Sequence, residues 1–327
     1  MDVPLIISIV VLSFLALASI FVFLVPYLTY KICFLSVRGK KKKKDAYAEL
    51  VNAAFEPYRE KFESLKASLL SREYEKCEIK SYDGLLLRAK YYKGNEGEPL
   101  HILFHGYRSS ANVDFCGGAE ECIKLSHSVL LVDQRAHGES EGKTISFGIN
   151  EKHDLHAWVN FAISKFGKDV KIFIWGISMG AATVLMSLDK PLPENVIGAI
   201  ADCPYSSPEE IIRKVGKGLH LPVGFLFPFL KLGARMFGGF RFDNSAPLLA
   251  VKSARIPILL IHGESDSYVP HYMSEKIVDA AKEAGVNLRF VSFPEAEHAM
   301  SYLSDSERYV GLVRGFIEEA MENAALK

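Results

Sequence analysis

Residues 172–183, IFIWGISMGAAT, decide how this chain folds. An apolar run rich in β-branched and aromatic residues ends abruptly, and small residues follow a single serine, Ser178. We expect a buried strand that turns directly into a helix. Such a turn has little room, and glycine at positions 176 and 180 relieves the crowding two residues either side of Ser178. The pattern predicts a hydroxyl held out beyond the strand, near the start of the helix.

Short apolar runs alternate with longer helical patterns on both sides of this stretch. Strands without polar positions, separated by helices, are typical of a parallel sheet covered on both faces. A hairpin is expected just upstream, because Asp83-Gly84 separates two alternating runs. The runs that we interpret as parallel strands are 101–106, 128–134, 170–176, 196–202, 256–263 and 288–293.

One interval is too long for an ordinary crossover. Residues 203–255 separate two expected strands and contain the apolar stretch 219–237, which Pro222 and Pro228 interrupt. We interpret this insertion as a lid over the carboxyl ends of the strands. A loop that dips into a membrane is the alternative.

The amino-terminal segment has a different composition. No charged residue occurs from Val3 to Tyr30, which exceeds the roughly 20 apolar residues that a bilayer-spanning helix needs. We therefore predict a transmembrane anchor over 1–30. A cleaved signal peptide is the alternative, although the run is long for one and lacks a basic start.

A basic linker and an amphipathic helix are expected over 31–73. Lys31, Arg38 and Lys40–Lys44 follow the apolar run, and positive residues are retained on the cytoplasmic side. This predicts a single-pass protein with the domain that follows on the cytoplasmic side. Apolar residues recur at helical spacing over 45–70, and we favour packing on the domain over lying along the bilayer.

The overall composition limits the possible partners. The 327 residues include 39 basic and 39 acidic ones, so nothing suggests a nucleic-acid partner. The five cysteines are scattered without metal-ligand spacing, which suits a reducing compartment and free thiols. We expect neither a metal nor an organic cofactor. The sequence leaves the oligomeric state open.

A serine hydroxyl is a poor nucleophile unless a base takes its proton and an acid orients that base. Enzymes that carry a serine at such a turn supply the acid and then the base later in the chain. Asp266 and His298 each follow a predicted strand, so both should reach the sheet edge that carries Ser178. The alternatives are Glu264 or Asp202 as the acid and His271 as the base.

The oxyanion formed by such an attack would need backbone N–H donors. We expect one from Met179, the residue after the nucleophile, and one from Tyr107, in the loop after the first parallel strand.

In order along the chain, FHGYRSS, DQRAHGES, GISMGAA, HGESDSYVP and EAEHAM resemble the motifs of the α/β-hydrolase superfamily over most of the chain. The resemblance is to the branch of monoglyceride lipases, serine aminopeptidase-like proteins and membrane-anchored bacterial hydrolases. It implies an α/β fold over 74–327, with a mostly parallel eight-stranded sheet, helices on both faces and a helical lid over 203–255. It also implies that Asp133, Arg135 and His137 form a structural turn.

We expect a serine hydrolase that cleaves carboxylic esters through an acyl-enzyme. The apolar insertion favours an acyl or lipid-like ester as the small-molecule substrate, contacted by Phe225, Phe227 and Phe229. A peptidase or amidase with the same triad is one alternative. A membrane-tethered protein that binds without catalysis is the other.

Overall fold

The computed structural model describes residues 2–36, 55–242 and 245–326. The lysine run 40–44 and the start of the predicted amphipathic helix lie outside these residues. The described part of that helix is present as η2 (Glu56–Tyr58) and α4 (Arg59–Ser71), and Leu69 is fully buried against the domain.

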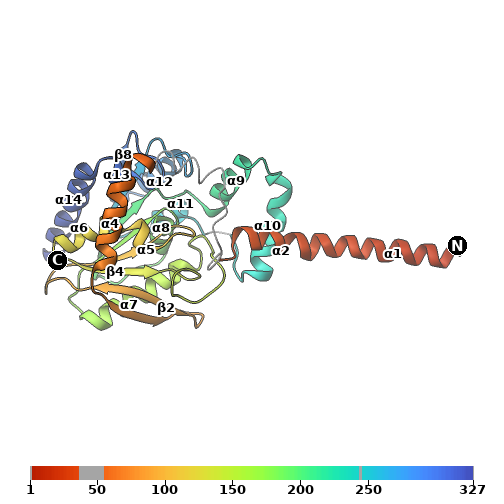
Figure 1. The fold of residues 1–327 in the computed structure, drawn as a ribbon, viewed down its shortest axis with the longest axis horizontal. Coiled ribbons are helices and arrows are strands. Elements are labelled where there is room, and N and C mark those ends of the chain that lie inside the picture. Colours follow the sequence, from red (N-terminus) through yellow and green to blue (C-terminus); the bar gives the residue numbers. More distant parts are fainter. Residues whose placement is uncertain (1, 37–54, 243–244, 327) are drawn as a thin grey trace. The chain divides into compact units, whose positions relative to one another are not determined.

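The predicted alternation of strands and helices is confirmed (Figure 1). The strands are β1 (Glu75–Lys80), β2 (Leu86–Tyr92), β3 (Leu100–Phe104), β4 (Ser128–Asp133), β5 (Ile172–Ile177), β6 (Val196–Asp202), β7 (Ile258–Gly263) and β8 (Leu288–Phe293). The helices around them are α5 (Ala111–Asp114), α6 (Cys116–Lys124), α7 (Glu151–Phe166), α8 (Met179–Ser187), α11 (Pro247–Ala250), η3 (Val251–Ser253), α12 (Tyr272–Glu283), α13 (Ser301–Ser304) and α14 (Ser306–Ala325).

All eight strands form one sheet, in the order β1-β2-β4-β3-β5-β6-β7-β8. β1 and β2 form the predicted antiparallel hairpin, and β3 to β8 run parallel to one another. Because the parallel strands point the same way, the loops that follow them meet at one edge of the sheet.

Both faces of the central strands, β3 to β7, are buried. Consecutive residues of a strand point to opposite faces, so Ile102 and Ile174 belong to one core cluster while Leu103 and Phe173 belong to another. The first cluster includes residues of α7, α8 and α12, and the second includes residues of α4, α6 and α14. This is why these strands lack the polar alternation of a half-exposed sheet.

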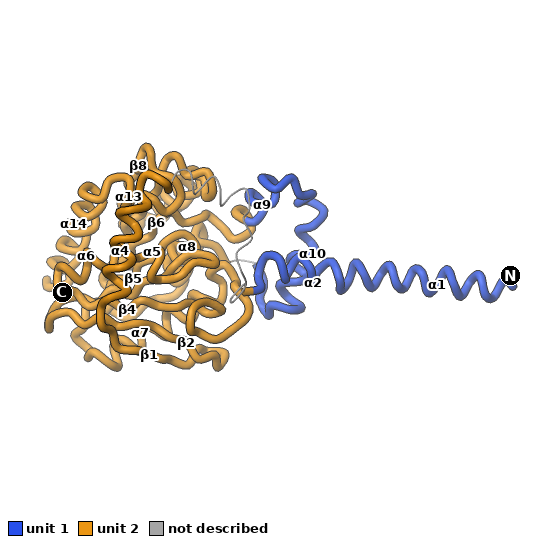
Figure 2. The backbone as a smooth tube through the Cα atoms, in the orientation of Figure 1, with its two compact units in different colours: residues 1–35, 212–243 blue, residues 36–211, 244–327 orange. Residues whose placement is uncertain are grey.

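The chain divides into two compact units (Figure 2). The sheet and its helices form the unit of residues 36–211 and 244–327, and the other unit joins residues 1–35 to 212–243. The second of these units contains α1 (Val3–Ser19), η1 (Ile20–Leu24), α2 (Val25–Cys33) and α10 (Val223–Phe237). Helix α9 (Pro208–Gly218) begins in the sheet unit and ends in this second unit. The predicted lid therefore packs with the amino-terminal helix, a pairing that the sequence analysis did not anticipate.

Candidate active site

Ser178 lies between β5 and α8, as the sequence predicts. Its backbone has φ 56° and ψ −116°, a region that non-glycine residues rarely occupy. The Ser178 N–H donates to the carbonyl of Asp202 at the end of β6, at 2.8 Å. The neighbouring strand thus holds the strained turn in place.

The two glycines are required by close backbone approach. A Cβ at Gly176 would lie 2.2 Å from the carbonyl carbon of Gly180. A Cβ at Gly180 would lie 1.7 Å from the carbonyl oxygen of Phe104, at the end of β3. Helix α8 therefore starts directly against the sheet, and only glycine fits at these two positions.

We predict that Gly180→Ala destabilises the fold by about 3 kcal/mol, because the clashing atom is backbone and cannot rotate away. The matched control is Gly315→Ala in α14, where a Cβ meets nothing within 4 Å. That change should be neutral or stabilising by up to about 1 kcal/mol. Denaturant unfolding measures both, and equal stabilities would contradict the tight elbow.

A hydrogen-bonded chain links the three residues predicted as nucleophile, base and acid. His298 Nε2 lies 2.9 Å from Ser178 Oγ, and His298 Nδ1 lies 2.7 Å from Asp266 Oδ2. Since the carboxylate accepts, Nδ1 carries the proton and Nε2 is the nitrogen that can receive the serine proton. The side chains come from the loops after β5, β7 and β8.

Asp266 is a buried carboxylate with several donors. Its Oδ1 accepts the backbone N–H groups of Tyr268 and Val269, at 2.9 and 2.7 Å. Burial alone would raise its pKa, but the imidazoles of His298 and His262 hold the pKa well below its usual value. Asp266 therefore stays ionised, which favours a positive charge on His298.

His262 is a residue of this site that the sequence analysis did not single out. Its Nε2 lies 3.2 Å from Asp266 Oδ2 and 2.8 Å from the carbonyl of Val269, and Ser274 Oγ lies 2.6 Å from its Nδ1. All three contacts are satisfied if Nε2 carries the proton and donates to both Asp266 and the Val269 carbonyl, while Nδ1 accepts from the Ser274 hydroxyl. The imidazole thereby orients the carboxylate. Its only sequence signal is a histidine at the end of an otherwise apolar strand.

The alternative acids and base make other contacts. Glu264 is exposed, and Asp202 is buried and accepts from the Tyr309 hydroxyl at 2.9 Å. Burial raises the pKa of Asp202 to about 6. His271 Nε2 lies 2.8 Å from Ser292 Oγ, so none of the three takes the place of Asp266 or His298 in the chain described above.

The loop after β3 lies against Ser178. A Cβ at Gly106 would be 3.4 Å from the Ser178 Cβ. Asp114 accepts the Gly106 N–H at 2.6 Å and also the Ser109 hydroxyl, which fixes the loop that carries Tyr107. Met179, the other expected donor, is fully buried at the first position of α8. Their role toward an oxyanion stays a prediction.

The DQRAHGES loop, 133–140, is a dense structural turn. Arg135 forms ion pairs with Asp154 and Asp83, and Asp133 accepts the Glu139 N–H at 2.9 Å. His137 also supports the loop after β3, because its Nε2 accepts the Arg108 N–H at 3.0 Å while its Nδ1 faces the Arg135 carbonyl.

Three potential metal-ligating atoms, from Cys203, Asp266 and His298, lie within 4.8 Å of one another. Burial raises the pKa of the Cys203 thiol well above its usual value, so the thiol stays protonated. Zinc and similar ions bind the thiolate. Asp266 Oδ2 and His298 Nδ1 are paired with each other, at 2.7 Å.

The expected acyl-contacting residues lie outside the sheet unit. Phe225, Phe227 and Phe229 are on α10, and the Arg213 guanidinium lies 3.8 Å from the Phe227 ring centroid. Their contact with a substrate stays a prediction.

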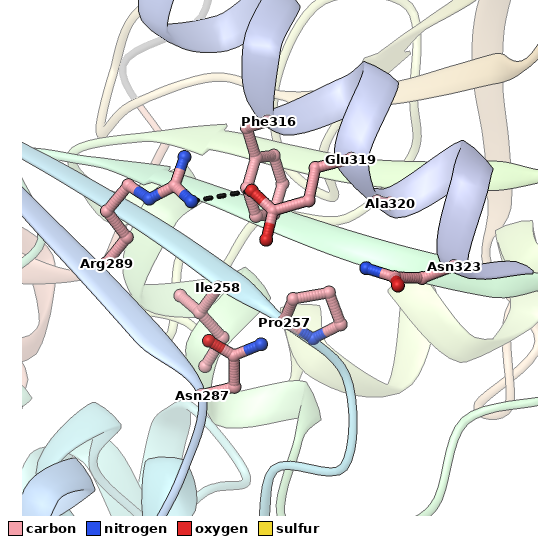
Figure 3. A pocket seen from close by; sticks show the side chains of 8 residues that line it. All are labelled: Pro257, Ile258, Asn287, Arg289, Phe316, Glu319, Ala320 and Asn323. Atoms are coloured by element: carbon pink, nitrogen blue, oxygen red, sulfur yellow. Dashed lines mark hydrogen bonds and ion pairs between the residues drawn. The ribbon is translucent and has the colours of Figure 1, made fainter.

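A small hollow lies at the opposite end of β7 and β8 from Ser178 (Figure 3). The Arg289–Glu319 ion pair, at 2.6 Å, crosses it. The hollow is far along the strands from the loops that carry the hydrogen-bonded chain. Its lining is Pro257, Ile258, Asn287, Arg289, Phe316, Glu319, Ala320 and Asn323.

Comparison with known proteins finds similarity to the α/β-hydrolase fold. Residues 99–227 match a model described as alpha/beta hydrolase fold, and residues 238–324 match the prolyl oligopeptidase family. A Pyrococcus furiosus esterase, Pf2001, superposes with a TM-score of 0.64 at 25% identity, covering 77% of this chain and 93% of the esterase.

Two curated relatives are similar in sequence. YqkD of Bacillus subtilis is 32% identical over 197 residues, which cover 60% of this chain and 64% of YqkD. The thiohydrolase aneE of Aspergillus aculeatus is 33% identical over 117 residues, covering 35% and 37% of the two chains. The chain thus spans less than two thirds of either relative.

Proposed function

We propose, from the premise that this chain belongs to the α/β-hydrolase superfamily, that it is a serine hydrolase acting on carboxylic esters with Ser178, His298 and Asp266 as its triad. The observation that carries the proposal is the continuous hydrogen-bonded chain from Ser178 Oγ through His298 to Asp266. The strained backbone at Ser178 and the similarity to an esterase support it.

In the first half of the proposed reaction, Ser178 Oγ bonds to the ester carbonyl carbon while its proton moves to His298 Nε2. Asp266 stabilises the imidazolium that forms. The carbonyl oxygen becomes an oxyanion, for which we propose the backbone N–H groups of Met179 and Tyr107 as donors. When the C–O bond to the alcohol breaks, the alcohol leaves with the proton from Nε2.

In the second half, water attacks the acyl-enzyme and gives its proton to His298 Nε2. The Ser178 ester bond breaks, the serine recovers that proton, and the carboxylic acid leaves. Every group in both halves comes from the protein, the substrate or water.

The proposal is tested by mixing the full-length, detergent-solubilised protein with a nitrophenyl ester and following nitrophenolate release. An acyl-enzyme mechanism predicts a burst stoichiometric with enzyme wherever deacylation is the slower half. Failure of the protein to turn over any ester or to form an acylated species would overturn the proposal.

The activity should fall at acid pH. Burial alone would lower the pKa of His298, but the charge of Asp266 and its hydrogen bond raise the pKa above the ordinary 6.5. Because only the neutral imidazole accepts the serine proton, kcat/KM should fall as pH drops through a midpoint above 6.5. A midpoint below 6.5 would contradict the proposed pairing.

An acyl or lipid-like substrate is the finer proposal. The apolar side chains of α10, Phe225, Phe227 and Phe229 among them, are the reason for it. Rates on short- and long-chain nitrophenyl esters, measured with the full-length protein, test it. Indifference to chain length would remove the support for an acyl-binding insertion.

A peptidase or amidase is the second candidate. The match of residues 238–324 to the prolyl oligopeptidase family favours it, and the same triad would serve. Measuring turnover of nitrophenyl esters and of aminoacyl nitroanilides separates the two, since only a peptidase or amidase predicts measurable cleavage of the anilides.

We also propose that the chain is anchored in a membrane by its amino-terminal helix, with the sheet unit on the cytoplasmic side. Val3–Cys33 is the one described helix that is long and apolar enough to cross a bilayer, and its strongly apolar part is not buried. A signal sequence would have the same length and composition. Membrane sedimentation with an amino-terminal sequence readout distinguishes an anchor from a cleaved signal, and protease protection of a carboxyl-terminal tag tests the orientation.

A further inference from the structure

We propose that the turn between α9 and α10 enters the lipid bilayer alongside the amino-terminal helix, as an interfacial hairpin with Leu219, Leu221 and Phe225 at its apolar tip. This inference rests on the membrane anchor proposed above. It assigns the bilayer, rather than a protein, as the partner of this surface.

Helix α10 packs against the end of the amino-terminal helix, and the residue numbers of the paired side chains rise together along the two helices. Phe229 meets Phe21 with ring centroids 5.9 Å apart, and Phe237 meets Tyr27 at 5.4 Å. Between these pairs, a Cβ at Gly233 would lie 2.2 Å from the Pro26 carbonyl oxygen. The two helix backbones therefore approach closely at Gly233 and Pro26.

The contact between Phe229 and Phe21 places this part of α10 at hydrocarbon depth. The charge-free run ends at Tyr30, and a bilayer core takes roughly 20 helical residues. Whichever segment of about 20 residues between Val3 and Tyr30 spans the hydrocarbon core, it includes Phe21. Phe229 is therefore level with the hydrocarbon core or its edge, and the ring centroid of Phe225 lies 5.3 Å from that of Phe229.

The side chains at that end suit lipid. Leu219, Leu221 and Phe225 are 61%, 46% and 57% exposed, although all three are large and apolar. Leu219 and Leu221 lie in the turn that joins α9 to α10, and Phe225 is in the first turn of α10. The amino-terminal helix is also apolar and exposed. If lipid acyl chains cover both the tip and this helix, the exposure of so many large apolar side chains is explained.

The charges fit a shallow insertion. Residues 212–242 contain basic side chains and no acidic one, which favours anionic headgroups. Lys217 is two residues before Leu219, and its long stem lets the ammonium reach the headgroups while the turn enters the acyl region. The depth is then that of an interfacial element, about 5–10 Å, rather than of a second span. The basic residues are Arg213, Lys214, Lys217, Lys231, Arg235 and Arg241.

The test uses the full-length protein in vesicles of phosphatidylcholine and phosphatidylglycerol, some with bromines near the headgroup end of the acyl chains. Two reporters at the tip, Phe225→Trp and Leu219→Trp, are compared with Met236→Trp, which lies 11 residues later on α10 and is 41% exposed. The native Trp158 and Trp175 are buried in the sheet unit and supply a constant background.

The emission added by Phe225→Trp or Leu219→Trp should be quenched by the brominated lipid, and the emission added by Met236→Trp should not. If the protein floats with the vesicles but both tip reporters escape quenching, this inference is wrong while the anchor stands. Protein that stays in solution with its amino-terminal helix intact would overturn the anchor and the inference together. Turnover of a soluble ester, assayed on the same unsubstituted protein, keeps the hydrolase proposal separate from both.

Discussion

Ser178→Ala is expected to reduce kcat for ester hydrolysis by about 10⁶-fold. The hydroxyl supplies the oxygen that bonds to the acyl group, and His298 Nε2, 2.9 Å away, has no other serine hydroxyl to activate in this chain of hydrogen bonds. The residue is buried at the elbow, but the change removes only an oxygen. Steady-state turnover of a nitrophenyl ester, with stability checked by thermal unfolding, measures the effect.

Ser71→Ala is the matched control. Ser71 is exposed at the end of α4, and its hydroxyl donates to the Ser68 carbonyl at 2.7 Å. Its turnover should equal that of the unsubstituted protein. If folded Ser178→Ala kept a substantial fraction of the ester-hydrolysing activity, another group would have to perform the chemistry.

Asp266→Asn is expected to reduce kcat by about 10⁴-fold. The amide keeps the size of the carboxylate, but it has no charge to stabilise the imidazolium and it can present a donor to His298 Nδ1. That contact would favour the wrong tautomer of His298. Loss of the charge also removes the cause that raises the pKa of His298, so the acid limb of kcat/KM should move to lower pH.

Glu264→Gln is the control for this prediction. Glu264 is the alternative acid, two residues from Asp266, and its side chain is exposed. Activity and pH profile should stay unchanged. A larger loss in Glu264→Gln than in Asp266→Asn would transfer the role of the acid to Glu264.

Much of the sheet and of the hydrogen-bonded chain could be predicted from the sequence, for one physical reason. Parallel strands buried on both faces are recognisable as short apolar runs, and their carboxyl ends share an edge. Once the runs ending near 177, 263 and 293 are placed, Ser178, Asp266 and His298 must lie close together. The glycines at 176 and 180 then mark which of these loops is the tight one.

The supporting contacts could not be predicted in this way. His262 resembles one more residue of a buried strand, and its role depends on the three-dimensional course of the loop that brings Asp266 and Val269 back to it. The same applies to Asp114 and His137, which hold the loop after β3. These contacts join residues whose spacing carries no periodic signal.

The pairing of α10 with the amino-terminal helix was also out of reach. Gly233 and Pro26 are about 200 residues apart in the chain, and each is unremarkable in its own segment. Both segments could be recognised as apolar, but their mutual register is a tertiary fact.

The most direct test of the central claim is covalent labelling of the full-length protein with a fluorophosphonate, followed by peptide mass spectrometry. We predict one adduct, on the peptide that carries Ser178, and its loss in His298→Ala. An adduct on a different residue, or active protein that resists the reagent, would contradict the account.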